Sequence, residues 1–142
     1  MTKPLMMAAS FLLTLSTTIV AATEETRELV ELPPMMQTHM MSNMRDHLRS
    51  LDLILQHLDA GELDLAAEVA ESRLGMSSLD LHGASHMAGF MPEEMRAIGT
   101  RMHQAASRFA LKAQEGEPLP AYRMLSEISS ACVACHTAYR IR

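Results

Sequence analysis

Apolar residues recur at intervals of three and four positions in four separate segments of this 142-residue chain. That spacing is the period of an α-helix with one buried face. Prolines and glycines stand between the segments, where they favour helix starts and stops. β-branched residues are scarce after residue 22, and no segment alternates as a half-buried strand would. The pattern therefore predicts an all-α chain, and the mostly short connections favour an antiparallel four-helix bundle.

The expected helices cover residues 34–59, 62–74, 92–114 and 120–139, and residues 76–91 form an irregular connection with a short helical turn around 78–86. Each helix has a predicted inward face. In the first helix this face consists of Met41, Met44, Leu48, Leu51, Leu55 and Leu58, and in the second of Leu63, Ala66, Ala67, Ala70 and Leu74. In the third it consists of Met95, Ile98, Met102, Ala105 and Phe109, and in the fourth of Leu125, Ile128, Cys132, Cys135 and Tyr139.

The N-terminus has the features of an export signal. Lys3 is followed by an uncharged stretch from Leu5 to Val20, and small residues precede the expected cleavage after Ala22. The apolar stretch is shorter than a membrane-spanning helix needs. We therefore expect residues 1–22 to be removed, 23–32 to be an acidic lead-in with no clear packing face, and 33–142 to form the bundle. The protein is then expected in the periplasm, with no membrane span in the mature chain.

The charge balance limits the classes of partner. The chain has 12 basic and 17 acidic residues, a formal net charge of −5, which argues against binding to nucleic acid. No catalytic triad or paired-carboxylate pattern emerges, so an enzyme is not expected. Aromatic residues make up only 4% of the chain, which leaves a thin aromatic core and suggests that another group fills the interior.

The chemistry lies in the sequence Cys132-Val133-Ala134-Cys135-His136, a CxxCH motif. Such a motif is typical of c-type haem attachment. On a helix the two cysteines and His136 share one face. The thiols could then form thioethers with the haem vinyl groups, while His136 binds the iron as the proximal ligand. A thioredoxin-like redox pair would require a βαβ unit, and a zinc site would require a second pair of ligands. A disulfide between the two cysteines would be strained, because neighbouring turns of one helix give a poor geometry for it.

The motif stands near the C-terminus and is followed by Tyr139 and Arg140. In this respect the chain resembles the class II cytochromes c, the cytochrome c′ family. A weaker similarity lies in Met44-Arg45-Asp46-His47-Leu48, which resembles the segment after that family's distal haem residue. The resemblance implies one haem c inside a four-helix bundle, with the first helix covering its distal face. It also implies two-fold dimers through the first helices, and the additional apolar side given by Leu53 supports a homodimer.

The residue on the distal side of the haem decides the function. The resemblance points to Met41 or Met40, one turn before Met44, and Met41 is the first choice because it shares a predicted face with Met44. A thioether opposite His136 would favour electron transfer between periplasmic proteins. Methionines at helical spacing also serve as core filler, and an open sixth position would bind a diatomic gas such as NO or CO. His39 is another potential sixth ligand.

Two groups of soft ligands offer a third hypothesis. Thioether and imidazole ligands favour copper, and an exported protein rich in both could bind it. The first group is Met35, Met36, His39, Met40, Met41 and Met44; the second is Met76, His82, His86, Met87 and Met91. Core methionines and solvated histidines are the alternative reading. Among the other histidines, His57 is expected to have a structural role near a helix end, His103 to point outward, and His47 to border the core.

Overall fold

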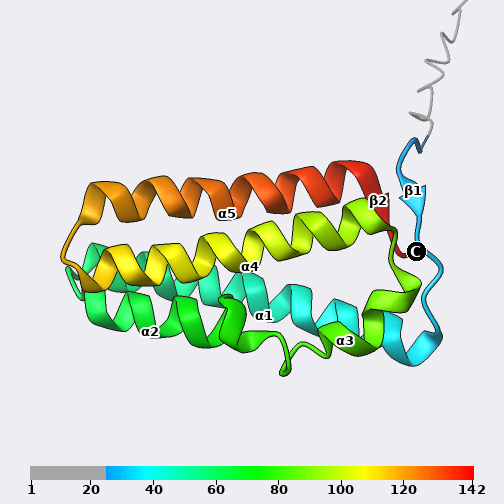
Figure 1. Ribbon diagram of the computed structural model, residues 1–142, viewed down its shortest axis with the longest axis horizontal. Helices are drawn as coiled ribbons and strands as arrows, with labels where there is room; N and C mark the ends of the chain where they lie inside the picture. Colours follow the sequence, from blue (N-terminus) through cyan, green and yellow to red (C-terminus); the bar gives the residue numbers. More distant parts are fainter. Residues whose placement is uncertain (1–24) are drawn as a thin grey trace, which may run out of the picture.

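The computed structural model describes residues 25–142 and contains five α-helices, which confirms the all-α class. The four longest are α1 (Pro34–Asp59), α2 (Leu63–Arg73), α4 (Glu93–Gln114) and α5 (Pro118–Ala138). They lie side by side along the long axis of the molecule (Figure 1). The predicted signal segment, residues 1–22, lies outside the described residues.

Glycines and prolines delimit these helices much as expected. α1 begins at Pro34, which follows Pro33, and Gly61 reverses the chain after its end with a φ of +74°. Gly116 has a φ of +72° in the turn between α4 and α5. Such positive φ values suit glycine because it lacks a Cβ atom. α5 starts at Pro118, two residues before the predicted start.

The connection between α2 and α4 is irregular, as predicted, with three short helical pieces. These are η1 (Met76–Ser78), α3 (Ala84–Met87) and η2 (Ala88–Phe90). Two hydrogen bonds tie the middle of this connection to α1, because Asn43 Nδ2 donates to the His82 carbonyl oxygen over 2.9 Å and a His39 ring nitrogen lies 2.9 Å from the same oxygen. The connection is therefore held against α1 and forms one wall of the interior.

The main core lies where α1 packs on α2, α2 on α4 and α4 on α5. The predicted faces of α2 and α4 are confirmed, since Ala66, Ala67, Ala70 and all five residues of the predicted α4 face are buried. Phe109 and Ile128 are fully buried in this core. Among the described residues, no helix is long and apolar enough to cross a bilayer.

The predicted face of α1 was wrong in part. Leu48 and Leu55 are 70% and 51% exposed, whereas Asn43 and Ser50 are buried. The face that points inward carries Met40, Asn43, Ser50, Ile54 and Leu58. The Asn43 side of the helix faces inward because Asn43 hydrogen-bonds to the 76–91 connection, and the buried Ser50 hydroxyl is satisfied by the Asp46 carbonyl oxygen within the helix.

The acidic lead-in does pack, contrary to expectation. Strand β1 (Glu28–Leu29) pairs in parallel with β2 (Tyr139–Arg140) directly after α5. Val30 N–H donates to the Arg140 carbonyl oxygen over 2.8 Å. Val30 and Leu32 are buried in a second, smaller apolar cluster. The two ends of the described chain therefore meet at one end of the molecule, as Figure 1 shows.

Candidate functional site

A cavity of about 320 Å³ opens between α1, the 76–91 connection, α4 and α5. This volume falls within the range of about 300–1,000 Å³ typical of ligand pockets. Its walls are mainly apolar, and methionines from three elements predominate: Met40 and Met44 of α1, Met87 and Met91 of the connection, and Met95 and Met102 of α4. Such side chains adapt their shape to an enclosed group.

The CxxCH motif lies in the last two turns of α5, on one wall of this cavity. Cys132, Cys135 and His136 all line it, as the helical spacing predicts. Both cysteines are half-buried and free, with no disulfide between them. Burial raises the pKa of the Cys132 thiol and of the Cys135 thiol, so both are protonated at neutral pH. Two thiols and an imidazole thus face one apolar space from the same helix face.

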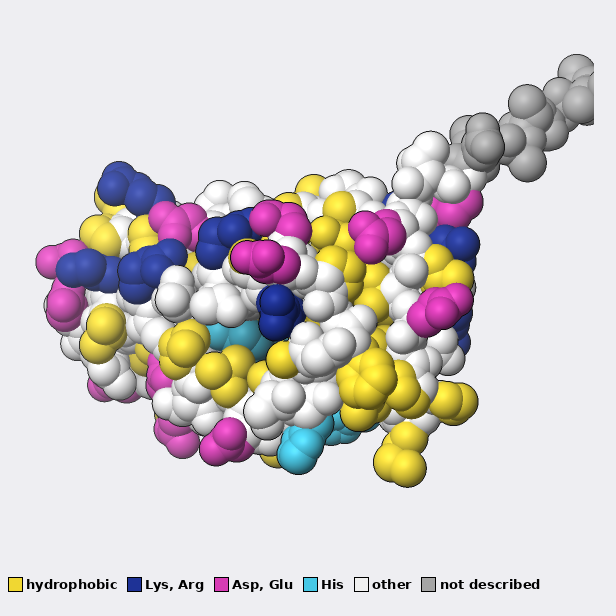
Figure 2. Space-filling model, turned by 45° about the vertical axis from the view of Figure 1, so that its right-hand side comes forward, with side chains coloured by type: hydrophobic (Ala, Val, Ile, Leu, Met, Phe, Trp, Pro, Cys, Tyr) yellow, Lys and Arg dark blue, Asp and Glu magenta, His cyan; other side chains and the backbone are white. Residues whose placement is uncertain are grey.

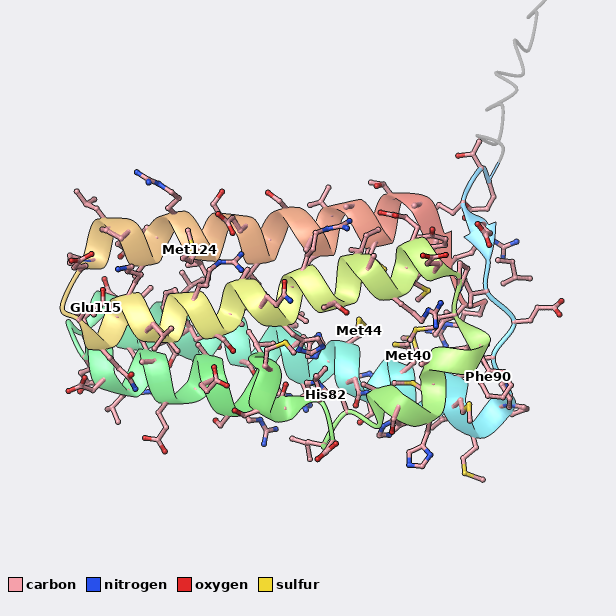
Figure 3. All side chains as sticks on the ribbon, in the orientation of Figure 1. Met40, Met44, His82, Phe90, Glu115 and Met124 are labelled. Atoms are coloured by element: carbon pink, nitrogen blue, oxygen red, sulfur yellow. The ribbon has the colours of Figure 1, made fainter. Side chains whose placement is uncertain are left out.

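Of the three predicted distal methionines, two line the cavity. Met40 is 8% exposed and Met44 is half-buried, and both lie on the α1 wall (Figure 3). Met41, the first choice from the sequence, is half-buried but does not line the cavity. The reason is the rotation of α1, which turns the Met40 and Asn43 side of the helix inward. His39 is also absent from the cavity wall and contacts the His82 carbonyl group instead.

The two predicted copper-ligand groups are brought together only in part. Met40, Met44, His82, Met87 and Met91 share the cavity wall. The remaining members do not line it: Met35, Met36, His39, Met41, Met76 and His86. Met35 is 84% exposed. Only part of each predicted copper-ligand group therefore lies where its members could bind one metal ion.

Three histidines also line the cavity: His47 of α1, His82 of the connection and His103 of α4. The outward orientation predicted for His103 was wrong, since this side chain is buried and its Nδ1 donates to the Leu74 carbonyl oxygen over 2.7 Å. His47 borders the interior as expected. Figure 2 shows histidine side chains beside hydrophobic ones on this face of the molecule.

The three imidazoles favour the neutral form. Burial, with smaller contributions from His82 and His103, lowers the pKa of His47 to about 4. Burial likewise lowers the pKa of His82, helped by the neighbouring His103. For His103, burial outweighs the hydrogen bonds to backbone carbonyls and lowers its pKa. The site is therefore a largely apolar cavity with three neutral imidazoles, methionine and cysteine sulfur atoms and the Arg96 side chain on its walls.

His57 lies outside this site, where a structural role was expected. Its Nδ1 is 2.7 Å from a Glu62 carboxylate oxygen, and this contact joins the end of α1 to the start of α2.

Comparison with known proteins identifies no relative: no family model, no curated protein and no solved structure matches this chain.

Proposed function

We propose that the protein is a periplasmic mono-haem c-type cytochrome of the cytochrome c′ kind, an antiparallel four-helix bundle that carries single electrons between redox partners. The observation that carries this proposal is the position of the CxxCH motif on the wall of a methionine-lined cavity, with Met40 and Met44 on the α1 wall. A motif with no such space beside it would not support a buried cofactor.

The residues present fit a covalently held haem c. Cys132 and Cys135 would each provide a thioether, and His136 would be the proximal iron ligand. A bound haem supplies a one-electron iron couple. The largely apolar walls would limit the access of water to the haem and lower the local dielectric, which tunes its reduction potential. A bound haem would also explain the low aromatic content, because it would occupy interior space that aromatic side chains fill in other proteins.

On the distal side we favour Met40 over Met41. Met40 is buried on the cavity wall, whereas Met41 lies outside it. Met44 also lines the cavity and is the second choice. A thioether bound opposite His136 would raise the reduction potential and suit electron transfer.

An alternative function is the binding of NO or CO. This function would require that neither Met40 nor Met44 binds the iron, so that its sixth position is open and the two methionines only pack beside it. The same visible spectra distinguish the two functions. In six-coordinate iron, sharp α and β bands of the reduced form do not move with CO; a five-coordinate iron gives a broad spectrum that shifts.

The test compares Met40→Ala with the matched control Met41→Ala, one position away on the same helix. We expect Met40→Ala to convert a low-spin spectrum into a high-spin, CO-binding one, and Met41→Ala to leave it unchanged. The opposite pair of results would restore Met41 as the distal ligand. Cys132→Ser with Cys135→Ser should abolish haem that survives denaturing electrophoresis, and covalent haem in that double variant would refute the attachment site.

The proposal includes the assembly and the partners. α1 exposes Leu48, Leu53 and Leu55 at 70%, 43% and 51%, which favours a homodimer through this helix. Light scattering at micromolar concentration tests this, and a monomeric mass would exclude it. The excess of acidic residues favours periplasmic partners with a basic surface.

Copper binding stays a second candidate because methionines from α1, the connection and α4 share the cavity. Thioether ligands suit Cu(I). Retention of one equivalent of Cu(I) by protein that carries no haem would favour it, and haem-loaded protein without copper would exclude it.

A further inference from the structure

Three imidazoles from three different elements meet on the cavity wall. The ring centroids lie 4.6 Å apart for His47 and His82, 5.5 Å for His82 and His103, and 5.9 Å for His47 and His103. The proposed electron-transfer function uses none of them. Three clustered histidines inside a largely apolar cavity therefore call for a separate explanation.

The hydrogen bonds determine the proton position in His103 and indicate it in His82. His103 Nδ1 contacts a carbonyl oxygen, which can only accept, so this nitrogen is protonated and Nε2 keeps its lone pair. Ser78 Oγ donates to the Gly75 carbonyl oxygen over 2.7 Å and can therefore accept from His82 Nδ1, 3.3 Å away. His82 Nε2 then also keeps its lone pair.

His82 is the most informative of the three. Its side chain is only 4% exposed, and Nε2 is buried with no hydrogen-bond partner. A buried ring nitrogen without a partner is uncommon and needs an explanation. In metal sites, a ligating histidine characteristically donates its other ring N–H to an oxygen acceptor. His103 Nδ1 makes such a contact, and His82 Nδ1 lies 3.3 Å from the Ser78 hydroxyl oxygen.

We propose that His47, His82 and His103 form a binding site for a divalent transition-metal ion with tetrahedral preference, of which Zn²⁺ is the simplest. Zinc lies about 2.0–2.1 Å from a ligating imidazole nitrogen, so three rings on one tetrahedral ion have centroids roughly 5 Å apart. The three measured separations lie around this value. With three protein ligands, the fourth position faces the cavity, as in open zinc sites.

Binding requires one side chain to turn. Within the described residues, no three His, Cys, Asp or Glu side chains are already arranged around a common point. His47 is the ring that must move, because its Nε2 faces His82 Nδ1 at 3.5 Å instead of the space beside His82 Nε2. That contact is long, and His47 is only half-buried, so its rotation disturbs little.

The test uses the purified full-length protein as isolated, with Zn²⁺ as the probe. We expect one equivalent of zinc to remain after gel filtration, measured by elemental analysis, and isothermal titration to give the affinity. His47→Gln and His103→Gln should each weaken binding more than about tenfold, since even outer-shell changes cost 10–100-fold. The matched control, His86→Gln, changes an exposed histidine outside the trio and should bind as wild type does.

X-ray absorption of the wild-type zinc complex decides the ligands independently of whether the variants fold. Nitrogen at about 2.0–2.1 Å supports the site, whereas sulfur at about 2.3 Å would assign the metal to Cys132 and Cys135 and overturn the proposal. Absence of binding, or equal binding by wild type and both folded trio variants, would also overturn it. Haem content is measured in the same samples. A failure of zinc binding then contradicts only the metal site, and an absence of covalent haem contradicts only the proposed cytochrome function.

Discussion

Acidification should destabilise the protein well above the pH at which carboxylates titrate. The pKa of His47 is lowered from 6.5 to about 4, and the pKa values of His82 and His103 are lowered as well. The unfolded chain therefore binds more protons than the native state below pH 6.5. The stability contributed by the neutral imidazoles is complete above that pH and is lost as the pH falls toward 4.

The magnitude follows from His47 alone. Between pH 7.5 and 5.5, a shift from 6.5 to about 4 removes about 1.3 kcal/mol of unfolding free energy. His82 and His103 add to this loss in the same direction. Burial would raise the pKa of Glu71, but hydrogen bonds from Ser107 and Ser77 outweigh it and lower the pKa. Glu71 therefore loses its contribution only below pH 4.5, outside this window.

The assay is urea unfolding of the protein freed of zinc with a chelator, at pH 7.5, 6.5 and 5.5, with the slope on urea concentration checked for constancy. His47→Gln should reduce the loss over this range by about 1 kcal/mol, and the exposed control His86→Gln should not. Equal stability at pH 7.5 and 5.5 would show that these rings are not held neutral by the fold. A His47→Gln protein with the wild-type pH dependence would exclude His47 as a source.

Three further predictions concern the scaffold. Ile128→Ala removes a fully buried side chain between α4 and α5 and should cost about 2–5 kcal/mol in urea unfolding; a cost below 1 kcal/mol would contradict its core position. In Gly75→Ala, the new Cβ would lie 2.8 Å from the Glu71 carbonyl oxygen, so we expect a loss of about 1–3 kcal/mol and a lower Tm; an unchanged Tm would refute the close approach. Arg108 and Glu127 are paired at 2.6 Å but are about half exposed, so a double-mutant cycle should give a coupling below about 1 kcal/mol; a larger value would show that solvent does not screen the pair.

Periodicity alone was sufficient for the helices whose inward face is uniformly apolar. The predicted face of α4 was correct because Met95, Ile98 and Phe109 leave only one side that can be buried. In α1 the same reasoning failed, because leucines occur on two sides and the choice between them depends on contacts with residues far away. Asn43, with its hydrogen bond to the His82 carbonyl group, has no local sequence signal that marks it as buried.

In the candidate site too, the features set by local spacing were predicted, and those set by distant contacts were not. The shared face of Cys132, Cys135 and His136 follows from helical spacing and was predicted. The buried position of His103 was not, because its acceptor on Leu74 lies 29 residues earlier in the chain. The lead-in was misjudged for a related reason, since Val30 gains a partner only when the last residues of the chain are in place.

The pairing of β1 with β2 has a kinetic consequence for access to the interior. The apolar cluster that contains Val30 and Leu32 also includes Met40, Met87 and Met95 of the cavity wall. Residues near the two ends of the described chain, joined through a two-residue strand pair, thus pack against methionines of the cavity wall. Chain ends open locally at far lower free energy than packed helices. Detachment of this strand pair while the helices remain folded should therefore loosen the methionine wall of the cavity, and the backbone amide of Val30 should exchange with deuterium much faster than those of α4.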